Sequence, residues 1–146
     1  MESVWDKAIK VAAAIAGAIS GIFGGWDSLM TALLAFLIVD YLSGIIVAWM
    51  GKSLKTQCGG LSSKVGAVGL AKKGLMLMVV LIGALLDQAI SVDGHMFRDA
   101  VCWFYMANEG ISIMENLALA GVPFPDKLMR LLGIREKTKA ENERDK

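Results

Sequence analysis

Long apolar stretches separated by short charged segments dominate this chain. Charged side chains gather at 52–73, at 87–99 and after 126, whereas 29–50 holds only one, Asp40. A helix that crosses a bilayer needs about 20 mostly apolar residues, and the stretches between the charged segments reach that length. The pattern predicts four membrane-spanning helices, at about 7–25, 28–50, 70–91 and 97–121.

These spans make the fold class an all-α integral membrane protein. Residues 1–125 form the transmembrane helical domain, and residues 126–146 form a charged cytoplasmic tail. The tail is predicted to be either a short amphipathic helix along the inner surface, built on Leu128, Leu131 and Leu132, or a disordered, solvated segment of mixed charge.

Composition agrees with a membrane protein. Of the 146 residues, 55% are apolar and 20% charged, and the mean hydropathy is +0.56; soluble domains have about 45–50% apolar and about 25% charged residues. The formal net charge of +1 gives no reason to expect nucleic acid as a partner. A soluble bundle is disfavoured because 29–50 has no polar face. A cleaved signal peptide is disfavoured because a second apolar run follows the first almost at once.

The distribution of lysine and arginine predicts the orientation. Residues 51–73 carry five lysines and no acid, the tail from Asp126 carries seven Lys or Arg, and the other two connections carry only Arg98. Positive residues stay on the cytoplasmic side, so both ends and the 51–73 loop are predicted to lie inside. Cys58 then faces reducing cytosol, and both it and Cys102 are predicted to be free thiols.

Tryptophans mark the ends of the predicted spans. Trp prefers the membrane–water interface, where its ring is apolar and its N–H stays hydrated. The 21 residues from Trp5 to Trp26 correspond to about 31 Å of helix, which matches a hydrocarbon core of about 30 Å. The predicted interfacial anchors are Trp5, Trp26, Trp49 and Trp103.

Small residues recur every four positions in the first predicted span. Gly17, Gly21 and Gly25, with Ala13 one step earlier, fall nearly on one helix face. Such spacing lets two helix backbones approach closely in lipid. The face is predicted to pack against another helix, either in a second copy of the chain or within the same chain.

The fourth predicted span carries a polar stripe. At about 100° per residue, six polar side chains fall within about a third of its circumference: Tyr105, Asn108, Glu109, Ser112, Glu115 and Asn116. An acid at the centre of a spanning helix costs about 2.5–3.5 kcal/mol, so this stripe should avoid lipid. The stripe is predicted to be either a seam that joins helices by hydrogen bonds or a water-facing surface in an oligomer. A third interpretation is that the whole helix lies flat in the membrane interface.

Asp40 is an acid in the middle of the second span. A mid-span acid is a functional-site hypothesis by default; the alternative is an acid bonded to Ser, Asn or a Lys of a neighbouring helix. His95 has no second histidine or cysteine nearby and is interpreted as a solvated loop residue. No nucleotide loop, zinc spacing or nucleophile–base pair is found, so neither an enzyme nor a metal or cofactor site is predicted.

Several local motifs occur together between the second span and the tail. They are Asp40-Tyr41-Leu42-Ser43-Gly44, then Ser63, Gly66, Gly69-Leu70, Lys72-Lys73 and Asp87, then Tyr105-x-x-Asn108-Glu109-x-Ile111-Ser112-Ile113-x-Glu115-Asn116-Leu117, and finally Gly121-Val122-Pro123-x-Pro125. Over about residues 29–132 the chain resembles phage holins of the toxin-secretion/phage-lysis type, the group that includes the clostridial toxin-secretion holin.

This resemblance implies a small multi-pass protein of the bacterial inner membrane. Such a protein accumulates among membrane lipids, assembles into a homo-oligomer and permeabilises the membrane, so that an endolysin or a toxin crosses. The family's polar motif residues would correspond to Asn108, Glu109, Ser112, Glu115 and Asn116.

The hypothesis from the sequence is therefore a non-enzymatic pore former whose polar stripe is sheltered by sister copies of the chain. The alternative is a small dimeric, proton-coupled membrane transporter in which Asp40 or Glu109 binds substrate or proton. A structural partner subunit without transport of its own is a weaker option.

Overall fold

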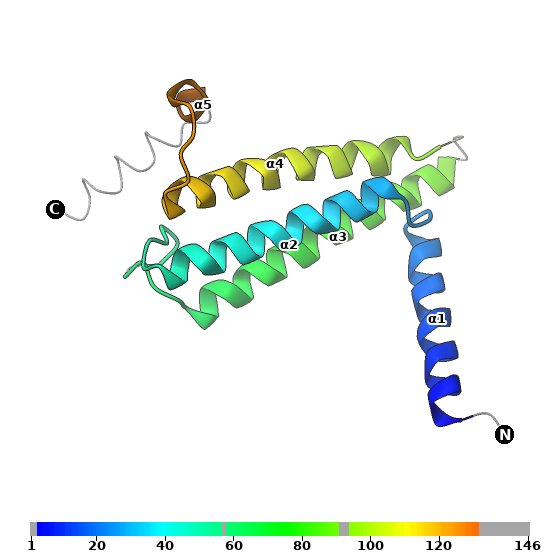
Figure 1. Cartoon of the computed structure of the whole chain (residues 1–146). Helices are drawn as coiled ribbons and strands as arrows, with labels where there is room; N and C mark the ends of the chain where they lie inside the picture. The colour runs from blue at the N-terminus through cyan, green and yellow to red at the C-terminus, as the bar shows by residue number, and fades with distance from the viewer. Residues whose placement is uncertain (1–2, 57, 91–93, 132–146) are drawn as a thin grey trace.

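The computed structural model describes residues 3–56, 58–90 and 94–131, and within these ranges it contains helices and no strand (Figure 1). The helices are α1 (Val4–Ile22), α2 (Ser28–Trp49), α3 (Ser63–Ile90), α4 (Met96–Ala120) and α5 (Asp126–Leu131). The all-helical prediction is confirmed.

Three long helices, α2, α3 and α4, form a bundle from which α1 projects away (Figure 1). α4 packs extensively along α2 and along α3, whereas α2 and α3 touch each other little. The buried apolar residues lie where α4 meets the other two: Met30, Leu33, Leu37, Val80, Cys102 and Met106. α4 is thus the helix that holds the bundle together.

Within the described residues, α2 and α3 are the two helices long and apolar enough to cross a membrane by themselves. α1 is 19 residues long but carries Asp6, Lys7 and Lys10, and α4 includes Glu109 and Glu115. Charges of this kind lower the hydropathy of a helix whatever direction they face. Helix length and hydropathy therefore support the second and the third of the four predicted spans.

α3 begins at Ser63 rather than near residue 70. Ser62 Oγ accepts a hydrogen bond of 3.5 Å from Val65 N and Ser62 O one of 2.9 Å from Gly66 N, which starts the helix earlier. Gly66 and Gly69 in this first part of the helix face the side chain of Tyr41 in α2. Lys72 and Lys73, counted with a basic loop in the sequence, are consequently helical.

The turn between α1 and α2 contains two glycines in the left-handed backbone region. Gly24 has φ 76° and Gly25 has φ 101°, a conformation that glycine adopts without steric cost. Gly25 therefore lies beyond the end of α1 and does not extend the face of Gly17 and Gly21. The turn directs α1 away from the bundle instead of back alongside α2 (Figure 1).

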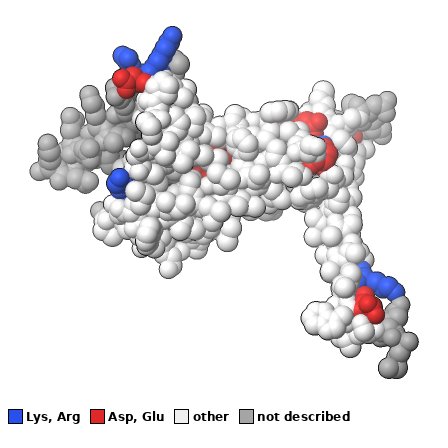
Figure 2. Space-filling model, viewed as in Figure 1, with Lys and Arg blue, Asp and Glu red and all other residues white. Residues whose placement is uncertain are grey.

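The outer surface of the bundle is apolar. Figure 2 shows charged groups mainly near the ends of the molecule, and the surface between them is largely uncharged apart from a small acidic area in the middle of the bundle. Large apolar side chains that are 52–60% exposed cover α2 and α3, among them Ile38, Leu42, Ile46, Leu75, Met78 and Ile82. A continuous apolar surface of this kind marks contact with a membrane or with another protein.

The tail begins with a short helix, one of the two forms predicted for it. α5 begins at Asp126, directly after Pro125, and is a short helix of 6 residues. Residues 132–146, the rest of the predicted tail, lie outside the described residues.

Candidate functional site

A cluster of charged side chains lies inside the bundle, with each helix contributing one member. Lys73 Nζ of α3 donates a hydrogen bond of 2.8 Å to Asp40 Oδ2 of α2 and another to Glu109 Oε2 of α4. All three residues are buried, with exposed fractions of 9%, 8% and 3% respectively. We call these residues, with Ser43 and Asn116, the polar cluster.

An amide and a hydroxyl complete the polar cluster. Asn116 Nδ2 of α4 donates to Ser43 Oγ at 2.9 Å and to Asp40 Oδ1 at 3.2 Å, and Ser43 Oγ donates to the Asp40 carbonyl at 3.0 Å. No buried side-chain nitrogen or oxygen in the described part of the chain lacks a partner. The cluster is thus a satisfied network, which fixes the relative positions of three helices.

The polar cluster holds one formal positive charge and two formal negative charges. One ammonium group is shared between the carboxylates of Asp40 and Glu109. Removing Lys73 would leave two buried carboxylates without a cation, whereas removing one carboxylate would leave Lys73 paired with the other. Lys73 is therefore the member on which both ion pairs depend.

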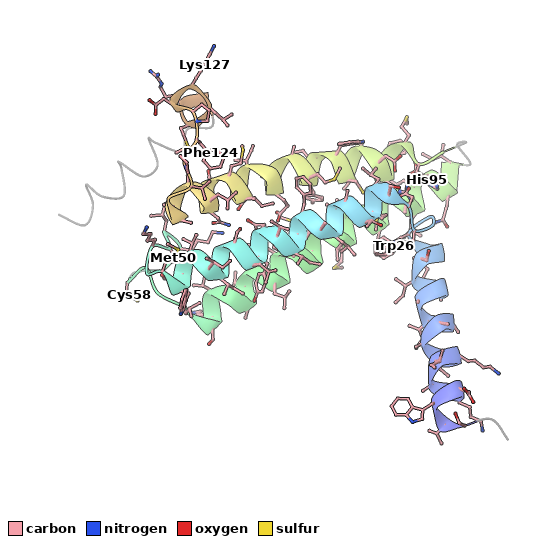
Figure 3. All side chains as sticks on the ribbon, viewed as in Figure 1. Trp26, Met50, Cys58, His95, Phe124 and Lys127 are labelled. Carbon is pink, nitrogen blue, oxygen red and sulfur yellow. The ribbon has the colours of Figure 1, made fainter. Side chains whose placement is uncertain are left out.

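A pocket of about 370 Å³ lies beside the polar cluster, between α2, α3, α4 and the loop that joins α2 to α3. Asp40, Lys73 and Glu109 form part of its wall, and Tyr41 lines it where α2 and α3 are apart. The pocket connects the polar cluster to the end of the bundle where Met50 and Cys58 lie (Figure 3). Trp26 and His95 lie at the opposite end.

A second charged group occupies that opposite end. The Arg98 guanidinium of α4 is fully buried, pairs with Asp27 and Asp99, and donates to the carbonyls of Phe23 and Gly25 at 3.3 Å each. Asp87 of α3 accepts hydrogen bonds of 2.9 Å from the backbone N–H groups of Phe97 and Arg98. These contacts fix the α1–α2 turn and the start of α4, which is a structural role.

Asp27 lies outside the long helices as the N-cap of α2. Its Oδ1 accepts a hydrogen bond of 2.9 Å from Met30 N. Partial burial opposes the charged carboxylate, but the N–H of Met30 and the guanidinium of Arg98 together hold the pKa of Asp27 below its ordinary value. A negative charge at a helix N-terminus is also favoured by the helix dipole.

The structure divides the predicted polar stripe of α4. Glu109 and Asn116 are buried in the polar cluster, Tyr105, Ser112 and Glu115 are partly buried, and Asn108 is exposed. Ser112 and Asn108 line the pocket. The stripe is therefore in part a seam within one chain, and its remaining polar groups lie at the pocket or on the surface.

The predicted small-residue face of α1 meets no other part of the described chain. A Cβ atom built on Gly17 or Gly21 would find no atom within 4 Å, and none of the residues of α1 is buried. Packing of this face within the same chain is therefore not observed among the described residues. Self-association remains the other prediction for it.

The four tryptophans are exposed, by 78%, 51%, 77% and 64% for Trp5, Trp26, Trp49 and Trp103. Trp5 and Trp49 lie in the first turn of α1 and at the last residue of α2. Trp26 Nε1 donates to Thr31 Oγ1 at 3.2 Å. These positions allow contact with an interface without loss of core packing.

Sequence reasoning missed Lys73 as the partner of both acids. It counted this lysine with the basic loop, although a lysine on a neighbouring helix was one of the readings of Asp40. The sequence did contain a sign of this role: Lys73 directly precedes the uncharged stretch 74–86. A lysine at the edge of such an apolar stretch is expected to pair with an acid. Within the described residues, no group of three or more His, Cys, Asp or Glu is placed to hold a metal ion.

Comparison with known proteins identifies the family. A sequence profile of the bacteriophage holin family matches residues 17–136. An uncharacterized 14.9 kDa protein from the nagH 3′ region of Clostridium perfringens is 43% identical over 111 residues, 76% of this chain and 79% of that protein. An uncharacterized protein of Listeria monocytogenes is 38% identical over 128 residues, 87% of this chain and 86% of that protein.

A phage protein is also similar. The probable holin of Bacillus phage phi105 is 34% identical over 93 residues, which cover 64% of this chain and 63% of the phage protein. No solved structure matches the chain. Because the family profile covers most of its length, including every residue of the polar cluster, this chain belongs to the bacteriophage holin family.

Proposed function

We propose that this chain is a holin that oligomerises in the bacterial cytoplasmic membrane and permeabilises it, so that an endolysin or a toxin lacking its own export route can cross. The observation that carries the proposal is the holin family match over residues 17–136. The proposed activity is not enzymatic, and it needs no metal or cofactor.

The geometry supports a multi-pass placement. α2, with 22 residues, is about 33 Å long, enough for a hydrocarbon core of about 30 Å. α4 carries acids, but Glu109 points into the bundle, whereas Trp103 and Phe104 are 64% and 68% exposed. α4 can therefore cross the membrane beside α2 and α3. α1 projects away from this bundle (Figure 1), so a fourth span, with both ends of the chain inside, would require α1 to reorient alongside it.

The route to a pore follows from the surfaces that one chain leaves exposed. α1 has no buried residue, and its Gly17 and Gly21 face is open. Contact of this face with another copy would bring the bundles of several chains together. The half-buried Ser112 and Glu115 and the exposed Asn108 of α4 would then border water once the assembly opens.

The test is controlled expression in bacteria with a co-expressed endolysin and a dye that reports membrane potential. Abrupt depolarisation followed by lysis is expected, and depolarisation without lysis when the endolysin is omitted. Glu115→Leu should change the time of depolarisation, and Ile111→Leu on the same helix is the control. Continued growth with an intact potential, despite protein in the membrane fraction, would contradict the proposal.

One observation favours a transporter as the second candidate. The pocket of about 370 Å³ is bordered by two carboxylates, Asp40 and Glu109, and a transporter would use such groups to bind a proton or a substrate. Cells would then tolerate expression, and vesicles containing the protein would keep a trapped dye while moving protons or substrate. Release of the trapped dye from the vesicles would support a holin and contradict a transporter.

A further inference from the structure

The pocket beside the polar cluster has basic groups at its rim. Five charged side chains line it, and three of them, Asp40, Lys73 and Glu109, satisfy one another at the buried end. The other two, Lys55 in the α2–α3 loop and Lys72 in α3, are exposed. Neither pairs within the polar cluster, whose formal charge of −1 offsets one of them, so the five charged side chains that line the pocket have a net formal charge of +1.

Hydroxyl groups also line this pocket. Ser53 and Ser62 line the same pocket, and the Oγ atom of each accepts a backbone N–H, from Lys55 at 3.3 Å and from Val65 at 3.5 Å. A hydroxyl that accepts still has a proton to donate. Two ammonium groups and two hydroxyl donors at one rim are the groups that bind a phosphate.

The rest of the lining is largely apolar. Ile45 and Ala48 of α2 and Val65 and Met76 of α3 face the pocket where α2 and α3 are apart. Lys55 belongs to the loop that follows α2, and Lys72 lies one residue before Lys73 on α3. A ligand that fits must therefore join a phosphate to a hydrocarbon chain.

We propose that this pocket binds an anionic phospholipid, with its phosphate at Lys55 and Lys72 and an acyl chain between α2 and α3. Basic pockets between spanning helices on the cytoplasmic side are known to hold anionic headgroups. The proposal rests on the membrane placement given under the proposed function, but it does not depend on pore formation. The lipid would fill the space that separates α2 from α3 and so stabilise the three-helix bundle seen in the structure.

The experiment uses the full chain purified in a neutral detergent. Retention of added phosphatidylglycerol, compared with phosphatidylcholine, is measured by native mass spectrometry. Lys55→Gln with Lys72→Gln removes the rim charges, and the control pair, Lys52→Gln with Lys64→Gln, removes two exposed lysines of the same region that do not line the pocket. Inorganic phosphate is titrated separately, so that a soluble phosphate can be told from a lipid headgroup.

Preference for phosphatidylglycerol should fall about fivefold for each rim lysine and about 25-fold for both, and it should change little in the control pair. An equal loss in both pairs would show only general surface electrostatics and would overturn the proposal. Binding of inorganic phosphate that needs Lys55 and Lys72, without preference for phosphatidylglycerol, would overturn the assignment to a lipid. The expression assay with endolysin is independent, so failure of the pore-forming function would be recognised separately.

Discussion

Lys73 Nζ of α3 lies 2.8 Å from Asp40 Oδ2 of α2, and this ion pair joins two helices that otherwise touch each other little. The same ammonium group pairs with Glu109 of α4. One lysine thus connects α3 to α2 as well as to α4, against which α3 also packs. A change at this lysine should therefore affect the whole bundle and not only its own helix.

Replacing Lys73 with methionine should destabilise the protein by about 3–5 kcal/mol, since it leaves two buried carboxylates without a cation. The free energy of unfolding is measured by circular dichroism as dodecyl sulfate is added to protein in mild detergent. Lys64→Met, at an exposed position of the same helix, should stay within about 0.5 kcal/mol of the natural protein. Equal stability of the two variants would show that the ion pairs contribute nothing.

Asn116 and Asn108 provide a matched pair on α4. Asn116 is 5% exposed and donates to Asp40 and Ser43, whereas Asn108 is exposed. Asn116→Ala leaves buried acceptors without their donor and should cost about 1–3 kcal/mol. Asn108→Ala should change the free energy of unfolding by less than about 0.5 kcal/mol. A loss of stability at Asn108 as large as that at Asn116 would mean that the outer part of the stripe is also packed, as in contact with a second chain.

The ends of α2 and α4 could be predicted accurately from the sequence. The predicted spans 28–50 and 97–121 agree with α2 (Ser28–Trp49) and α4 (Met96–Ala120) within a residue at each end. Asp27 before α2 and Gly121 after α4 are ordinary cap residues. Local signals of this kind act within a few residues and need no knowledge of the fold.

The partners within the polar cluster could not be predicted in the same way. Lys73 and its acids are 33 and 36 residues apart, and only the packing of α4 against both α2 and α3 brings them together. The direction of α1 relative to the bundle could not be predicted either, because Gly24 and Gly25 impose no preferred direction on the chain. Sequence pattern thus identified the stripe on α4, whereas the fold decided which of its groups are satisfied within one chain.

Gly83 marks the closest approach of α3 to α4. A Cβ atom at this position would lie 3.0 Å from Arg98 Cα and 3.1 Å from Arg98 N, both backbone atoms that cannot move aside. Gly83→Ala should therefore separate the two helices and cost about 1–3 kcal/mol. Gly74→Ala in the same helix meets no atom within 4 Å and should be neutral or stabilising by up to about 1 kcal/mol. If both variants are equally stable, the helices do not approach as described.

Asp27 should make stability depend on pH in the acidic range. Its pKa in the folded protein is held below the ordinary value of about 3.9 by the N–H of Met30 and the guanidinium of Arg98, although partial burial opposes this. A lowered pKa means that the carboxylate stabilises the folded state fully above the ordinary pKa and loses this contribution as the pH falls through the lowered one. Because the side chain is 43% exposed, the contribution should not exceed about 1 kcal/mol.

Asp27→Asn tests this directly, because asparagine keeps an acceptor for Met30 N and removes only the charge. The variant should be less stable than the natural protein at about pH 6, and the difference should be smaller at about pH 3, because the contribution of the charge declines as the pH falls below the ordinary pKa. Asp27→Ala loses the cap as well and should remain less stable by about 1 kcal/mol at both pH values. Unfolding in mixed micelles at the two pH values gives the comparison. If the difference between the natural protein and Asp27→Asn is the same at both, the charge of Asp27 is not coupled to folding through Arg98.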